Sequence, residues 1–206
     1  MKFRNLTILA AAAAAAAAVG LGACATNDGA HSAMSTPVGP GSAAVSSPAG
    51  ANFSAADVEF AQGMIPHHEQ AVEMADIALS PAVEAGAKVR NLATQIKAAQ
   101  DPEIQTMTGW LTTWGQPMQM DTGAGHAMSS MDGMMSDSEM NTLNALKGAE
   151  FDAIWIKMMI RHHEGAIAVA QKVKANGSTP GVLALADQII SAQQGEIAEM
   201  KSLQGS

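Results

Sequence analysis

The feature that most constrains this chain is an internal repeat. Residues 64–71 (MIPHHEQA) match residues 159–166 (MIRHHEGA) at an offset of 95 positions. A second match, between residues 92–107 and 185–200, follows at an offset of 93 positions. Two matches in the same order and at nearly the same offset predict that the folded part contains two copies of one supersecondary unit.

Each copy holds two segments in which apolar residues recur at helical spacing, so each copy is predicted to be a helical hairpin. Aromatic residues make up 3% of the chain and tyrosine is absent, which disfavours a β-sandwich or barrel. Two hairpins form a four-helix bundle. The predicted fold class is therefore all-α, a four-helix bundle over residues 53–206.

Capping signals predict the limits of the first hairpin. Ser54 and Asp57 have the spacing of a capping box that opens the first helix, which ends at about Leu79. Ser80 followed by Pro81 fits an N-cap and first position of the second helix. That helix is expected to end near Gly115.

Similar signals predict the second hairpin. Ser136 and Glu139 form another capping box, which opens a short helix that Gly148 interrupts. The third long helix should end at Gly177, and the fourth should cover residues 182–203.

A poor helix former occupies the same place in both hairpins. Pro102 lies inside the second helix, where it should kink or break the hydrogen-bond ladder, and its counterpart is Gly195. A bend shared by both hairpins is the expectation.

The repeated His-His pairs are the candidate metal ligands of the bundle. His67 and its counterpart His162 share a helical face with apolar residues and should point into the bundle, whereas His68 and His163 should flank the core. A methionine one turn earlier places a thioether beside the imidazole. The predicted ligands on the helices are Met64, His67, His68, Met74, Met159, His162 and His163.

Histidines on an apolar face can also be ordinary core residues that hydrogen bonds satisfy. Two His-His pairs at matched positions of a pseudo-twofold bundle favour metal ligation instead, because imidazole is the commonest metal-ligating side chain.

The linker between the hairpins, residues 116–136, is rich in methionine and contains no Leu, Ile, Val, Phe or Trp. A segment that needed apolar bulk would mix aliphatic residues, so the thioether itself is favoured. Its Gly, Ser and Asp residues predict a flexible, solvated segment unlike a core. The candidate ligands are Met118, Met120, His126, Met128, Met131, Met134 and Met135.

Soft thioethers prefer Cu(I) and Ag(I), and imidazole adds affinity for Cu(II). Thioethers also cannot be lost to disulfides in an oxidising compartment. The linker therefore predicts copper as the bound metal. A low-complexity linker or a sacrificial oxidant trap is the alternative.

The N-terminus predicts export. Residues 1–23 have a basic start and a short apolar stretch typical of a signal peptide, and Leu21-Gly22-Ala23-Cys24 resembles a bacterial lipobox. Cys24, the single cysteine, would then carry the lipid; an ordinary signal peptide with a chance cysteine is the alternative. Residues 24–52, rich in Gly, Ser, Ala and Pro, are predicted to be a disordered tether.

Charge and cysteine content exclude other classes. The net charge of −8 argues against a nucleic-acid binder, and one cysteine excludes Cys-rich zinc or iron–sulfur sites.

The paired Met-Ile-x-His-His-x-x-Ala motifs, the matched Gln-Ile-x-x-x-Gln-x-x-Glu-Ile-x-x-Met segments and Phe151-Asp152 resemble the bacterial family called domain of unknown function 305. The resemblance covers roughly residues 53–203. It implies a ferritin-like four-helix bundle in an exported protein, and some members are periplasmic copper-binding proteins linked to copper resistance. On that resemblance the motif positions are Met64, His67, His68, Met159, His162 and His163.

Ferritin-like folds also host di-iron or di-manganese oxidoreductases, which use Glu-x-x-His on two helices. This chain has no Glu-x-x-His, and the repeat-matched Glu103 and Glu196 lack a histidine partner in the sequence. An interaction module without metal is a third alternative.

The sequence thus predicts a non-enzymatic, lipid-anchored extracytoplasmic bundle that binds copper for buffering, resistance or delivery. Its expected partners are the metal ion, the membrane through the N-terminal lipid, and a copper-handling protein.

Overall fold

The computed structural model describes residues 53–120 and 132–204. The predicted signal peptide, Cys24, the tether and three linker residues (His126, Met128 and Met131) lie outside these ranges. The helices are α1 (Ala55–Leu79), the 3-10 helix η1 (Pro81–Val83), α2 (Ala87–Trp114), α3 (Asp137–Ala145), α4 (Gly148–Asn176) and α5 (Pro180–Gln204). Within the described ranges the fold is all-α, as predicted, and none of these helices combines the length and apolarity needed to cross a membrane.

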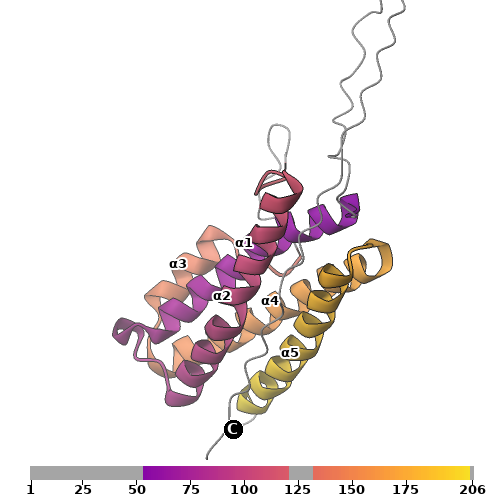
Figure 1. The fold of residues 1–206 in the computed structure, drawn as a ribbon. Coiled ribbons are helices and arrows are strands. Elements are labelled where there is room, and N and C mark those ends of the chain that lie inside the picture. Colours follow the sequence, from indigo (N-terminus) through magenta and orange to yellow (C-terminus); the bar gives the residue numbers. More distant parts are fainter. Residues whose placement is uncertain (1–52, 121–131, 205–206) are drawn as a thin grey trace, which may run out of the picture. The chain divides into compact units, whose positions relative to one another are not determined.

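The four long helices form two hairpins (Figure 1). α1 packs along α2, and α4 packs along α5. Contacts between α1 and α4 join the two hairpins, and the short α3 lies against α4. The repeat therefore predicted the architecture correctly.

Both capping boxes are present. The Ser54 side chain accepts from the backbone of Asp57, and Ser136 accepts from Glu139 at the start of α3. The prediction that Ser80 and Pro81 begin the second long helix is wrong. They open η1 instead. α2 begins at Ala87, six residues after Pro81, with Gly86 as its N-cap.

Pro102 does not break α2, which continues from Ala87 to Trp114 through the proline. The loss of one helical hydrogen bond is tolerated because the helix is held by packing against α1. Of the two expected outcomes at Pro102 the break is wrong, and the bend shared by both hairpins stays a prediction.

Two aspartates related by the repeat join the hairpins at their turns. Asp57 of α1 accepts hydrogen bonds from Ser178 and Thr179 in the α4–α5 turn. Asp152 of α4 accepts from the backbone N–H of Gly86 in the α1–α2 turn, at 3.0 and 3.1 Å. Each hairpin therefore holds the turn of the other.

The apolar core consists of two clusters with a polar layer between them. One cluster contains residues 71–78 of α1 with residues 151–160 of α4, and the other contains residues 60–65 of α1 with residues 166–173 of α4. α1 and α4 are therefore antiparallel. The residues between the clusters on the four long helices include His67, His68, Gln100, Glu103, His162, His163, Gln193 and Glu196.

Candidate metal centre

All four repeated histidines lie in this polar layer, and each is 0% exposed. The expectation that His68 and His163 flank the core is wrong. They are as fully buried as His67 and His162, because α2 and α5 cover the sides of α1 and α4 that carry them.

The second histidine of each pair contacts a glutamate of the partner helix in its own hairpin. The Nε2 atom of His68 lies 2.8 Å from Oε2 of Glu103, and that of His163 lies 2.6 Å from Oε2 of Glu196. In the sequence these glutamates lack a histidine partner; in the fold they have one. Because the repeat matches Glu103 with Glu196 and His68 with His163, it was the signal that could have predicted one histidine–glutamate pair in each hairpin.

Two buried glutamines belong to the same layer and were not predicted as part of the site. Gln100 is 2% exposed and Gln193 is 3% exposed, and each precedes the histidine-bound glutamate by three residues, one helical turn. Both amide atoms of Gln100 and Oε1 of Gln193 have no hydrogen-bond partner among the described residues.

The imidazoles carry further unpartnered atoms. Within residues 53–120 and 132–204, Nδ1 has no hydrogen-bond partner in any of the four histidines, and His162 also lacks one at Nε2. Buried polar atoms are nearly always satisfied, since an unpaired one costs about 1–3 kcal/mol. Such a concentration of unpaired nitrogens is typical of a ligand-binding centre.

His67 and His162 meet at the interface of the two hairpins, with their ring centroids 3.8 Å apart and tilted by 43°. Burial lowers the pKa of His67 to about 3, and the nearby His68 acts in the same direction. Burial also holds the pKa of His162 well below its ordinary value, with His67 contributing. Both rings are therefore neutral at physiological pH, the state that binds metals.

The last part of the linker covers this pair. The Asp132 carbonyl accepts a hydrogen bond from Nε2 of His67 at 3.3 Å. The next residue, Gly133, has a φ of +90° and lies against Gly165. A Cβ atom added to Gly165 would be 1.9 Å from the Asp132 carbonyl oxygen. The pair of glycines permits a backbone-to-backbone approach that any side chain would prevent.

α1 anchors the linker at two points. Gln62 donates to the Pro117 carbonyl at 2.8 Å. Gln70 both donates to the Met135 carbonyl at 2.9 Å and accepts from the Met135 N–H at 2.7 Å. We call residues 132–135, held by Gln70, Gly165 and His67, the strap.

Linker methionines differ in their surroundings. Met118 is 41% exposed and Met120 37% exposed, as expected for a solvated linker. Met135 is buried, with its sulfur accepting from Arg161 at 2.6 Å, so the prediction that the linker is unlike a core is wrong at this end. Met134 is partly exposed.

The methionines of the helices that were predicted as ligands, Met64, Met74 and Met159, are fully buried. Met64 and Met159 lie one turn before His67 and His162, as predicted, and belong to opposite apolar clusters. Met74 lies in the same cluster as Met159, and its carbonyl accepts from the Trp155 indole at 2.8 Å.

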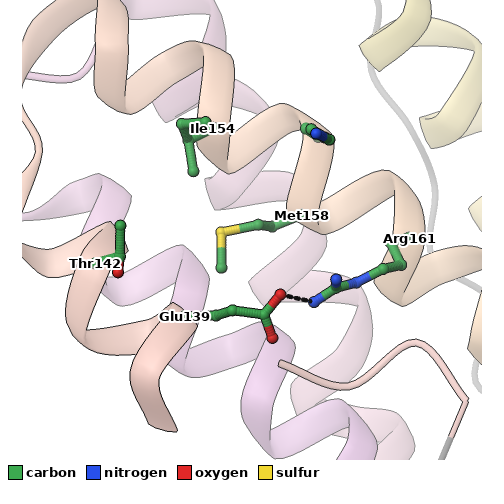
Figure 2. A pocket seen from close by; sticks show the side chains of 6 residues that line it. Glu139, Thr142, Ile154, Met158 and Arg161 are labelled. Atoms are coloured by element: carbon green, nitrogen blue, oxygen red, sulfur yellow. Dashed lines mark hydrogen bonds and ion pairs between the residues drawn. The ribbon is translucent and has the colours of Figure 1, made fainter. Parts of the chain in front are cut away.

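A surface pocket of about 260 Å³ lies between α3 and α4 (Figure 2). Met158 points into it, and Arg161 bridges to Glu139 at its rim. Of the predicted ligands that lie in the described residues, none lines this pocket. The histidine layer is therefore a separate, internal site.

The donor atoms suit copper chemically. Buried imidazoles whose Nδ1 atoms have no partner among the described residues, with thioethers one helical turn before His67 and His162, are the N and S donors that Cu(II) and Cu(I) prefer. No group of three or more His, Cys, Asp or Glu is arranged as a metal site in the described parts of the chain.

Comparison with known proteins identifies the family. A model described as "Domain of unknown function (DUF305)" matches residues 57–204. The chain belongs to the DUF305 family. Among curated proteins no relative of this chain was found.

Solved structures of this family are similar to the bundle. A presumed secreted DUF305 protein of Streptomyces coelicolor is 32% identical, covering 72% of this chain and 91% of its own, with a TM-score of 0.66. A DUF305 fragment of Deinococcus radiodurans is 33% identical, covering 74% and 97%, with a TM-score of 0.64. CopM in its Cu(II)-bound form is 32% identical, covering 72% and 95%, with a TM-score of 0.60. CopM is also known in Cu(I)-bound and Ag-bound forms.

Proposed function

We propose that this protein binds copper outside the cytoplasm and serves in its buffering, resistance or delivery. The observation that carries the proposal is the layer of four buried histidines whose Nδ1 atoms have no partner among the described residues, with Met64 and Met159 one turn before His67 and His162. The copper-bound and silver-bound forms of CopM, a relative at 30–32% identity, support it.

Two kinds of ligand suggest two tasks. The imidazoles on packed helices are preorganised nitrogen donors that suit Cu(II), and Met64 and Met159 extend the set to Cu(I). The linker methionines, of which Met118 and Met120 are exposed, would capture Cu(I) from solution. Gathering them around an ion costs conformational entropy, so their binding should be weaker and more readily reversed.

The first experiment separates these tasks. Metal-free protein is titrated with Cu(II) and with Cu(I) against a competing chelator. Changing His67 and His162 to Gln should weaken Cu(II) binding strongly and leave Cu(I) uptake by the linker. Changing Met118, Met120, Met128 and Met131 to Ser should lower Cu(I) capacity and spare Cu(II).

Both variants leave the strap residues 132–135 unchanged. The histidine variant alters the contact between Asp132 and His67, whereas Gln70 still holds Met135. Circular dichroism establishes that each variant is folded. Full Cu(II) affinity in the folded histidine variant would show that these histidines are structural and would contradict the site assignment.

A di-iron oxidoreductase is the competing function for a ferritin-like bundle with histidine–glutamate contacts. Exposure of the metal-free protein to Fe(II) and oxygen should give no oxo-bridged absorption band. Stoichiometric iron uptake with oxygen consumption would reverse the order of the two functions.

The lipid anchor is part of the same proposal. The lipobox-like residues that end in Cys24 support a lipid-anchored protein, and the presumed secreted relative from Streptomyces supports an extracytoplasmic one. Cys24→Ala should release the protein from the membrane fraction or stall its processing. Equal incorporation of labelled fatty acid into the variant would contradict lipidation at this residue.

A further inference from the structure

The two histidine–glutamate contacts use the same ring nitrogen. Glu103 and Glu196 each present Oε2 to Nε2 of their histidine, at 2.8 and 2.6 Å. An ionised carboxylate has no hydrogen to donate, so the imidazole must be the donor. In the neutral ring, a donor at Nε2 places the proton on Nε2 and leaves the lone pair on Nδ1.

Nδ1 is the unpartnered nitrogen in both rings. Nδ1 of His68 and Nδ1 of His163 are buried, with no hydrogen-bond partner among the described residues. The glutamate side chains are 17% and 16% exposed while the histidines are 0% exposed, so the carboxylates lie at the rim of the layer. The lone pairs are thus left inside the bundle.

His67 follows the same rule with a different partner. Its Nε2 contacts the Asp132 carbonyl, which is also a pure acceptor, and its Nδ1 is unpartnered within the described parts of the chain. Three of the four buried imidazoles therefore present Nδ1, although their partners come from α2, α5 and the strap.

We propose that Glu103 and Glu196 are positioning residues that hold His68 and His163 with the proton on Nε2, so that copper binds at Nδ1. A carboxylate on the far nitrogen fixes the ring orientation and raises the basicity of the nitrogen that binds the metal. The assignment of the metal to Nδ1 rests on the proposed copper function, whereas the tautomer does not.

The first test needs no metal. Nitrogen-15 NMR of the histidine rings of the metal-free protein, at mildly alkaline pH, distinguishes the two neutral tautomers. We expect the Nε2–H tautomer at His68 and His163. A dominant Nδ1–H tautomer at either ring would overturn the proposal, whatever the variants do.

The variants are Glu103→Leu with Glu196→Leu, and Glu103→Gln with Glu196→Gln. Leucine removes the acceptor, so the two rings should become mixtures of tautomers. Glutamine keeps an oxygen that accepts the same N–H, so it should preserve the Nε2–H tautomer. The control, Glu69→Leu with Glu164→Leu, removes two exposed, repeat-matched carboxylates beside the same histidines and should leave the tautomers unchanged.

The second test adds metal. The leucine variant should lose about 10–100-fold in Cu(II) affinity, measured by chelator competition. The glutamine variant should lose less, and the control should bind like the wild type. In the wild type loaded with diamagnetic Ag(I), the Nδ1 resonances of His68 and His163 should shift more than the Nε2 resonances, and a larger shift at Nε2 would overturn the proposal.

The outcomes separate this inference from the proposed function. Copper binding that the folded leucine variant retains in full would reject the positioning role and keep the function. Absence of copper binding in the wild type, with the expected tautomers, would reject the function and with it the metal at Nδ1. If the leucine variant does not fold, the tautomers and the Ag(I) shifts of the wild type decide alone.

Discussion

The two hairpins contribute matching residues to the histidine layer, but the residues next to that layer differ between them. Each contributes a His-His pair, a glutamate bound to the second histidine and a buried glutamine. The two copies of the repeat differ at two nearby positions. Pro66 aligns with Arg161, and Gln70 aligns with Gly165.

Three of these four divergent residues contact the end of the linker. Gln70 holds both backbone groups of Met135, Arg161 donates to its sulfur, and Gly165 receives the backbone of Gly133. The positions that face the centre of the layer are the same in both copies, whereas the neighbouring positions differ so that one linker can be held. A single asymmetric strap thus covers a nearly symmetric site.

The two aspartate contacts show a similar imbalance. Asp57 is fully buried and accepts from Ser54, Ser178 and Thr179, whereas Asp152 is partly exposed and accepts from Gly86. Burial tends to raise the pKa of Asp57, but hydrogen bonds from Ser54, Thr179 and Ser178 outweigh it and hold the pKa below its ordinary value.

The largest predicted effect is a loss of stability at low pH. His67 and His162 have pKa values lowered by burial, so the folded protein binds fewer protons than the unfolded chain once the pH falls below about 6.5. Their contribution to stability should be complete above that pH and lost progressively as the pH falls toward about 3. Urea unfolding of the metal-free protein between about pH 7 and pH 4 measures this loss.

Equal roles for the two hairpins predict that His67→Gln and His162→Gln flatten this pH dependence to a similar degree. If only one variant reduced the pH dependence of the free energy of unfolding, the two histidines would not contribute equally to it.

The next effect compares the two aspartates. Asp57→Ala should lower the free energy of unfolding by about 3 kcal/mol, because it removes a cap and leaves several buried donors unpaired. Asp152→Ala, which frees one backbone N–H, should cost about 1 kcal/mol. Chemical denaturation at neutral pH provides both values, and equal costs would contradict the imbalance described above.

Gly165→Ala tests the contact between the strap and α4. The added methyl group would overlap the Asp132 backbone, so the strap must detach or the helix must shift, at a net cost of about 1–3 kcal/mol. Hydrogen exchange at the Met135 amide should accelerate. The matched control is Gly195→Ala in α5, where the methyl group meets no atom within 4 Å and should stabilise the helix by up to about 1 kcal/mol.

Gln70→Ala should have the smallest effect. It removes two hydrogen bonds to the Met135 backbone and should cost about 1 kcal/mol, with faster exchange of that amide. Unchanged exchange in this variant would show that Gly165 and His67 hold the strap without Gln70.

The sequence by itself determined the all-α class, the two hairpins and most helix limits. Helical periodicity and capping are local, and the boxes at Ser54 and Ser136 form within one turn. It misplaced the start of α2, because Pro81 is as suitable for a 3-10 turn as for a first helical turn. It did single out the four histidines that the fold brings into one buried layer, since the His-His pair occurs in both copies of the repeat.

Tertiary structure alone decided what surrounds those histidines. Glu103 lies 35 residues from His68 and Glu196 lies 33 residues from His163, so helix packing had to bring each pair together. Burial of the second histidines depends on the neighbouring helices, and burial of Met135 depends on Gln70 and Arg161. Periodicity describes one helix at a time, whereas contacts between helices depend on how their faces meet.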